Sequence, residues 1–60
     1  MELKHIVLIG GKDFVLGENL VKKIFMFNNE TPLTLVTLYN NTILEETIVQ
    51  IPYHSVLYYI

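Results

Sequence analysis

Short stretches in which apolar side chains alternate with polar ones run along this chain, a pattern typical of β-strands. Residues 3–9 read LKHIVLI, Gly10-Gly11 follows, and residues 13–16 form a second apolar stretch. Two glycines between such stretches predict a tight turn, because glycine tolerates positive φ angles. We therefore expect a β-hairpin built from Leu3–Ile9 and Asp13–Leu16.

The stretch from Gly17 to Asn29 fits two structures. Apolar side chains at positions 16, 20, 21, 24 and 25 have the spacing of one helix face. The β-branched and aromatic residues of Ile24–Phe27 favour a strand instead. Residues 18–27 therefore form either a short helix, ended by Asn28 or Asn29, or a strand.

The second half of the chain is strand-like. Thr31-Pro32 predicts a break, and a proline can begin a strand but does not sit within a central ladder. The next stretch, LTLVTLY at 33–39, is largely apolar on both faces, which is typical of a central strand. The remaining expected elements are a turn at Asn40-Asn41, a strand at Ile43–Ile51 interrupted by Pro52, a tight turn at Tyr53–Ser55 and a short last strand at Val56–Ile60.

Composition supports the same class of fold. Valine, isoleucine and threonine make up 18 of the 60 residues, and alanine, the best helix former, is absent. A chain of this length forms one domain, here residues 1–60. We expect a mainly β fold, a small five-stranded antiparallel sheet or barrel, which becomes α+β if residues 18–27 are helical.

Several classes of protein are excluded by composition. The chain has no cysteine, which rules out a disulfide framework. Its 52% hydrophobic content and net charge of −2 are unlike those of disordered proteins. Its longest apolar runs are far shorter than the roughly 20 residues of a spanning helix, so no membrane is expected. The start Met1-Glu2 lacks the basic and apolar regions of a signal peptide, which predicts a cytoplasmic protein.

Residues 49–60, VQIPYHSVLYYI, predict a strand, one tight turn and a short strand. This tail resembles the closing segment of Src-homology-like barrels and the second motif of Sm-like RNA chaperones. The positions of Gly10 and Gly17 are similar to the first Sm motif. The Src-homology resemblance implies a small barrel without the tryptophan-containing peptide site, because tryptophan is absent. The Sm-like resemblance implies an oligomeric RNA-binding protein, with Tyr53 and His54, joined by Lys4, as contacts.

Candidate catalytic chemistry is sparse. Ser55 is the only serine, and its neighbour His54 points to the opposite side in extended structure. A metal site needs His5, His54 and a carboxylate to converge. Four lysines and an isoelectric point near 5.5 argue against nucleic-acid binding. We expect a non-enzymatic protein with no catalytic residues, no metal and no cofactor.

Self-association is the partner prediction. A domain of about 60 residues buries only about 60% of the surface that its unfolded chain exposes, so a second subunit is a common source of stability. The apolar content is also more than one small core can hide. We expect a homo-oligomer, in contact with itself or with another protein partner. The interface residues expected from the apolar stretches are Leu33, Leu35, Tyr39, Val56, Tyr58, Tyr59 and Ile60.

Overall fold

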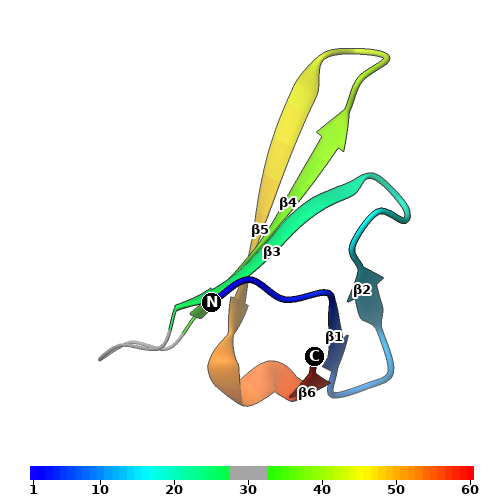
Figure 1. Ribbon diagram of the computed structural model, residues 1–60. Coiled ribbons are helices and arrows are strands. Elements are labelled where there is room, and N and C mark those ends of the chain that lie inside the picture. The colour runs from blue at the N-terminus through cyan, green and yellow to red at the C-terminus, as the bar shows by residue number, and fades with distance from the viewer. Residues whose placement is uncertain (28–32) are drawn as a thin grey trace.

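The computed structural model describes residues 1–27 and 33–60. It is mainly β, with six strands and one turn of 3-10 helix, the latter written η1 (Figure 1). The elements in chain order are β1 (His5–Leu8), β2 (Asp13–Val15), β3 (Val21–Phe27), β4 (Leu33–Asn40), β5 (Glu45–Pro52), η1 (Tyr53–Ser55) and β6 (Val56–Tyr59).

The strands form two antiparallel sheets of three strands each. One sheet has the order β2-β1-β6 and the other the order β3-β4-β5. The expected single five-stranded sheet or closed barrel is therefore wrong. The chain turns sharply between β2 and β3, where Gly17, Asn19 and Leu20 all have positive φ angles, and this turn separates the sheets. The segment 53–55 forms the expected tight turn, as η1.

The helical interpretation of residues 18–27 is also wrong, because Val21–Phe27 is a strand. The positive φ angles at residues 17, 19 and 20 interrupt any helix at its start. Pairing with the adjacent β4 then gives the β-branched and aromatic side chains a pleated surface. Tertiary pairing thus outweighs the helical spacing of the apolar residues.

Other predictions at the level of elements are confirmed, with shifted ends. The β1–β2 turn contains Gly10 and Gly11 at φ of 102° and 96°. β4 is the central strand of its sheet, as its apolar faces indicated. The strand predicted to begin at Ile43 begins two residues later, because Ile43 and Leu44 belong to the β4–β5 turn. The break predicted at Thr31-Pro32 and the helix end at Asn28 or Asn29 lie outside the described residues.

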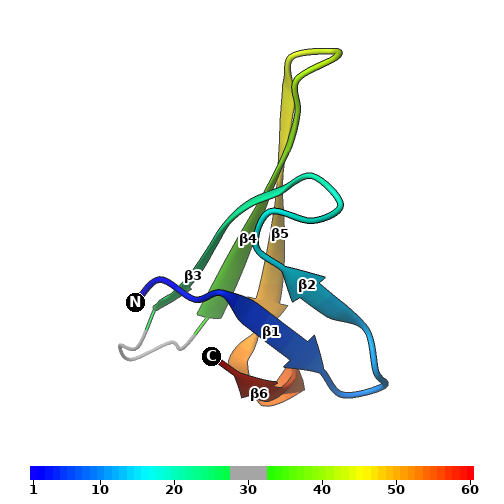
Figure 2. The same ribbon diagram turned by 45° about the vertical axis from the view of Figure 1, so that its right-hand side comes forward.

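The core lies between the two sheets and is small. Its buried apolar side chains are Leu3, Ile6, Val21, Ile24, Met26, Val36 and Ile51. Residues 1–3 run along the outer edge of β3, where the Leu3 N–H donates to the Ile24 carbonyl at 2.9 Å. The β4–β5 hairpin projects beyond this body, and Ile43 and Leu44 at its tip are exposed (Figures 1 and 2).

Candidate functional site

The outer face of the β3-β4-β5 sheet carries a group of apolar side chains, which we call the outer sheet face. Its residues are Phe25, Phe27, Leu33, Leu35 and Ile48. Cross-strand register builds it, because Phe25 lies directly opposite Leu35 and Phe27 directly opposite Leu33. The two phenylalanine rings meet edge to face with their centroids 4.9 Å apart. A shallow groove of about 240 Å³ on this face is lined by Lys23, Phe25, Phe27, Leu35 and Thr37.

The residues that were expected to form the interface lie on two different sheets. Leu33 and Leu35 belong to the outer sheet face, and Tyr39 follows on the same side of β4. The tail forms β6 in the other sheet, where Val56 packs against the core. The two sets therefore do not form one continuous surface.

The remaining tail residues are exposed on or beyond β6. Tyr58 and Tyr59 lie on this edge strand, and Ile60 follows it. The Tyr58 ring meets the His5 ring edge to face, at 6.2 Å between centroids. Tyr58 thus has a partner within its own chain.

Two aromatic residues of the outer sheet face were not among the predicted interface residues. Phe25 and Phe27 fall in the segment that fits both helix and strand. If that segment is a strand, the two residues lie on one face, since side chains alternate with a period of two. The sequence therefore indicates that Phe25 and Phe27 share a face only if this segment is interpreted as a strand.

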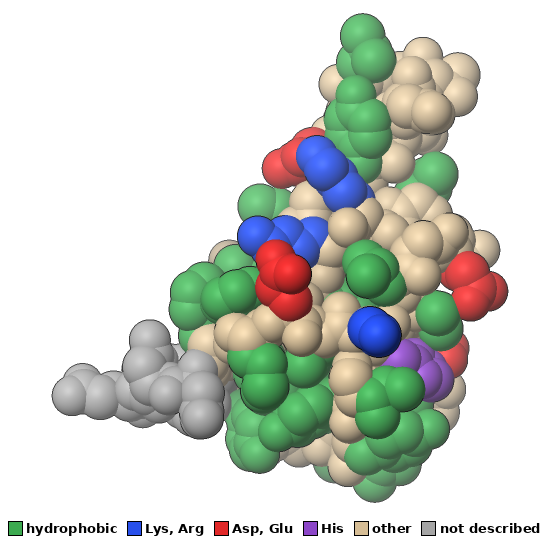
Figure 3. All heavy atoms as spheres, in the orientation of Figure 1, with side chains coloured by type: hydrophobic (Ala, Val, Ile, Leu, Met, Phe, Trp, Pro, Cys, Tyr) green, Lys and Arg blue, Asp and Glu red, His purple; other side chains and the backbone are tan. Residues whose placement is uncertain are grey.

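A second surface feature is a groove between residues 2–4 and β3, which we call the lysine groove. Its volume is about 420 Å³, and its lining residues are Glu2, Leu3, Lys4, Leu16, Lys22, Lys23 and Ile24. Leu3 and Ile24 are buried at its floor, and Leu16 is the exposed aliphatic side chain of its lining. Several lysine side chains and an acidic side chain gather on this face of the molecule (Figure 3).

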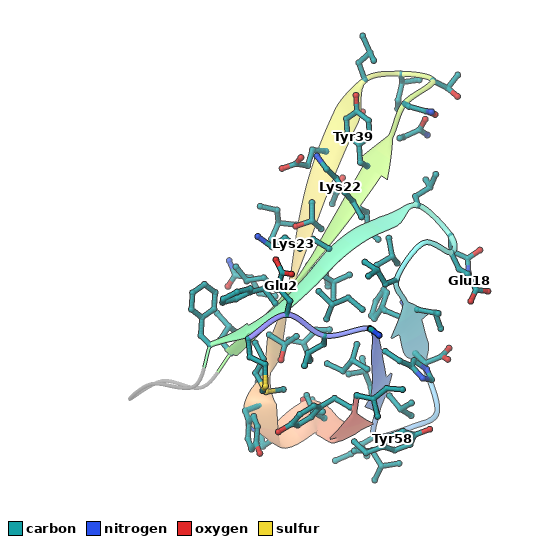
Figure 4. The ribbon with its side chains drawn as sticks, in the orientation of Figure 1. Glu2, Glu18, Lys22, Lys23, Tyr39 and Tyr58 are labelled. Carbon is teal, nitrogen blue, oxygen red and sulfur yellow. The ribbon has the colours of Figure 1, made fainter. Side chains whose placement is uncertain are left out.

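A β-bulge brings two consecutive lysines into the lysine groove. Successive side chains of a regular strand point to opposite faces. The register of β3 shifts between Val21 and Lys23, so Lys22 is an extra residue in the ladder. Lys22 and Lys23 are therefore both exposed between buried Val21 and buried Ile24, and both line the groove (Figure 4).

The ion pairs of these lysines are long and exposed. Lys22 Nζ lies 3.7 Å from Glu46 Oε2, and Lys23 Nζ lies 4.0 Å from Glu2 Oε1. Exposed pairs of this kind contribute about 0–1 kcal/mol to stability. Each lysine also lies over an aromatic ring, Lys22 at 5.0 Å from the centroid of Tyr39 and Lys23 at 5.3 Å from that of Phe25.

The three residues expected to contact RNA lie in two separate parts of the structure. Tyr53 and His54 lie together in η1, where both are exposed. Lys4 lies in the lysine groove, which neither of the other two residues lines. The structure therefore joins Lys4 to the lysines of β3 rather than to η1.

The histidines occupy separate elements. His5 in β1 is 2.9 Å from the carboxylate of Asp13 in β2, a pair set by the β1–β2 register. His54 and Ser55 are successive residues of η1. Across residues 1–27 and 33–60, no three side chains of the metal-binding types lie together.

Comparison with known proteins gives no family. No protein-family model matches the sequence, and neither the curated proteins nor the solved structures hold a match to it. In the part of the chain that the structure describes, no helix is long and apolar enough to cross a membrane. Function therefore has to be inferred from the outer sheet face and the lysine groove.

Proposed function

We propose that this protein is a non-enzymatic interaction module that self-associates through its outer sheet face. The observation that carries the proposal is the cross-strand ladder of Phe25, Phe27, Leu33 and Leu35, with Ile48 beside it on β5. Contiguous apolar patches on small proteins mark interaction sites, whereas single exposed apolar residues do not.

The small size of the core supports the proposal that a second copy of the chain covers the outer sheet face. Seven apolar side chains are buried in the part of the chain that the structure describes, and β5 is exposed along most of its length. A domain of this size gains stability by covering such a face. Two antiparallel sheets pack face to face at about 10 Å, the arrangement of a β-sandwich.

Charges at the rim are compatible with a two-fold arrangement. Lys22 and Lys23 lie on β3, at one side of the face, and Glu46 lies on β5, at the other side. When the two-fold axis runs parallel to the central strand β4, between the two packed sheets, β3 of one copy lies opposite β5 of the other. Lysines of one copy then come opposite Glu46 of the partner subunit, which favours this pairing over one with like charges opposed.

The oligomeric mass of matched variants tests the proposal. Sedimentation velocity of the wild type is expected to give a dimer. Leu35→Glu and Ile48→Glu are each expected to weaken the dimer at least roughly a hundredfold, because either places an unpaired charge inside an apolar interface. Leu57→Glu is the control, since Leu57 is more exposed than either residue but lies on β6. Circular dichroism of each variant verifies that it folds.

Two results would contradict self-association through this face. One is a monomeric wild type at about 100 μM, a concentration well above most dimer dissociation constants. The other is an unchanged oligomeric mass in both folded outer-face variants. A loss of mass in Leu57→Glu alone would instead place the contact on β6, where the tail residues Tyr58 and Tyr59 lie.

A second candidate function is an Sm-like RNA-binding ring. What favours it is the local structure of the tail, where β5, the single turn η1 and β6 follow in the order of the resemblance noted for residues 49–60. Exposed Tyr53 and His54 then provide a stacking ring and a polar contact. A ring of five to seven subunits with co-purified RNA, seen by native mass spectrometry and absorbance ratio, would support it. A dimer free of nucleic acid would exclude it.

A further inference from the structure

We infer that the lysine groove binds an acidic segment of a partner protein, one in which single aliphatic side chains are interspersed among carboxylates. This site adjoins the outer sheet face, whose rim includes its Lys22 and Lys23, but the inference does not rest on self-association. The first support is charge. Lys4, Lys22 and Lys23 against Glu2 leave a net charge of +2 on the groove lining, within a chain whose net charge is −2.

The positive charge of the groove is produced by the fold. Lys22 and Lys23 are adjacent in sequence and would face opposite sides of a regular strand. The bulge in β3 turns both toward solvent, and residues 2–4 bring Lys4 alongside them. Bulges often re-aim side chains at binding sites. Three of the four lysines of the chain thus line one groove.

Lys22 and Lys23 lie over aromatic rings but have only long, exposed ion pairs. The aromatic rings of Tyr39 and Phe25 lie under Lys22 and Lys23, which limits the freedom of these side chains. Their carboxylate partners are 3.7 Å and 4.0 Å away and exposed, so exchange for a ligand carboxylate costs little. Figure 4 shows both lysines and Glu2 on the same side of β3, with Glu18 on a separate turn.

The floor of the groove decides the class of ligand. Exposed Leu16 provides an aliphatic contact beside the buried Leu3 and Ile24, which suits a leucine or isoleucine side chain. A single strand of nucleic acid needs aromatic stacking surfaces, and none of the residues that line this groove is aromatic. An acidic peptide with aliphatic residues matches the lysine rim and the floor together.

A labelled peptide tests the site directly. Fluorescence anisotropy with Leu-Glu-Glu-Leu-Glu-Glu is expected to show binding that the glutamine analogue Leu-Gln-Gln-Leu-Gln-Gln lacks. Lys4→Glu is expected to weaken binding roughly fivefold to tenfold, since it replaces an attraction by a repulsion. Lys12→Glu is the matched control, because Lys12 is the fourth lysine and lies outside the groove. Amide chemical shifts are expected to move at Leu3, Leu16 and Ile24.

Four outcomes would overturn the inference. Equal loss in Lys12→Glu would mean that net charge alone attracts the peptide. Equal binding of the glutamine analogue would remove the role of the lysines. Shifts confined to Leu35 and Ile48 would place the peptide on the outer sheet face. Tighter binding of an oligothymidylate than of the acidic peptide would make nucleic acid the ligand.

Discussion

Thr34 is a polar residue within the apolar core. Its side chain is 0% exposed, on the inner face of β4 between Met26 and Ile51 of the neighbouring strands. Its hydroxyl has no hydrogen-bond partner within the described part of the chain. A buried hydroxyl that loses its water without gaining a partner destabilises the folded state.

Thr34→Val is therefore expected to raise the free energy of unfolding by about 1 kcal/mol, because it keeps the branched shape and removes the hydroxyl. Thr47→Val on exposed β5 is the control and should change this free energy by less than about 0.5 kcal/mol. Urea denaturation of both variants measures the difference. A stability loss in Thr34→Val would show that the hydroxyl is satisfied in the folded protein.

The β4–β5 hairpin has an exposed apolar tip. Ile43 and Leu44 at its tip are 61% and 76% exposed. Asn40 Oδ1 accepts hydrogen bonds from the N–H groups of Thr42 and Ile43 at 2.9 Å and 3.4 Å, which shapes the turn. Leu44 has a φ of 53°, in the left-handed region that costs a leucine roughly 1–2 kcal/mol.

Leu44→Gly is expected to stabilise the hairpin by about 0.5 kcal/mol, the relief of left-handed strain less the entropy that glycine adds to the unfolded chain. Ile43→Gly, next to it without a positive φ, should lose about 0.5–1 kcal/mol. Thermal unfolding of both variants gives the comparison. The same sign of change at both positions would contradict a strained Leu44.

Two surfaces of different character define the molecule as a whole. The outer sheet face is apolar at its centre, while the lysine groove is charged at its rim. Salt screens exposed charges but does not weaken apolar burial. The two proposed interactions should therefore separate when ionic strength is changed.

From about 50 mM to about 500 mM sodium chloride, the dimer dissociation constant is expected to change less than about threefold. Binding of the acidic peptide should weaken at least roughly fivefold over the same range. Sedimentation velocity and anisotropy on one preparation measure the two effects. If both constants change in parallel, a single surface serves both interactions.

The sequence by itself determined the properties that depend on neighbouring residues. Side-chain alternation and residue type identified most strands, because a pleated strand has a period of two wherever it lies. Gly10-Gly11 identified its turn, since positive φ is a local requirement. The apolar stretch at 33–39 likewise indicated a central strand and supplied Leu33 and Leu35 of the outer sheet face.

Only the tertiary structure decided which segments share a surface. Residues 18–27 have local preferences for both helix and strand, and pairing with β4 selected the strand. The bulge that puts Lys22 and Lys23 on one face depends on the register of β3 with β4. The sheet division that separates the tail from 33–39 depends on the pairing of β6 with the distant β1. Such register is set by the packing of the whole core, so no local pattern along the chain reveals it.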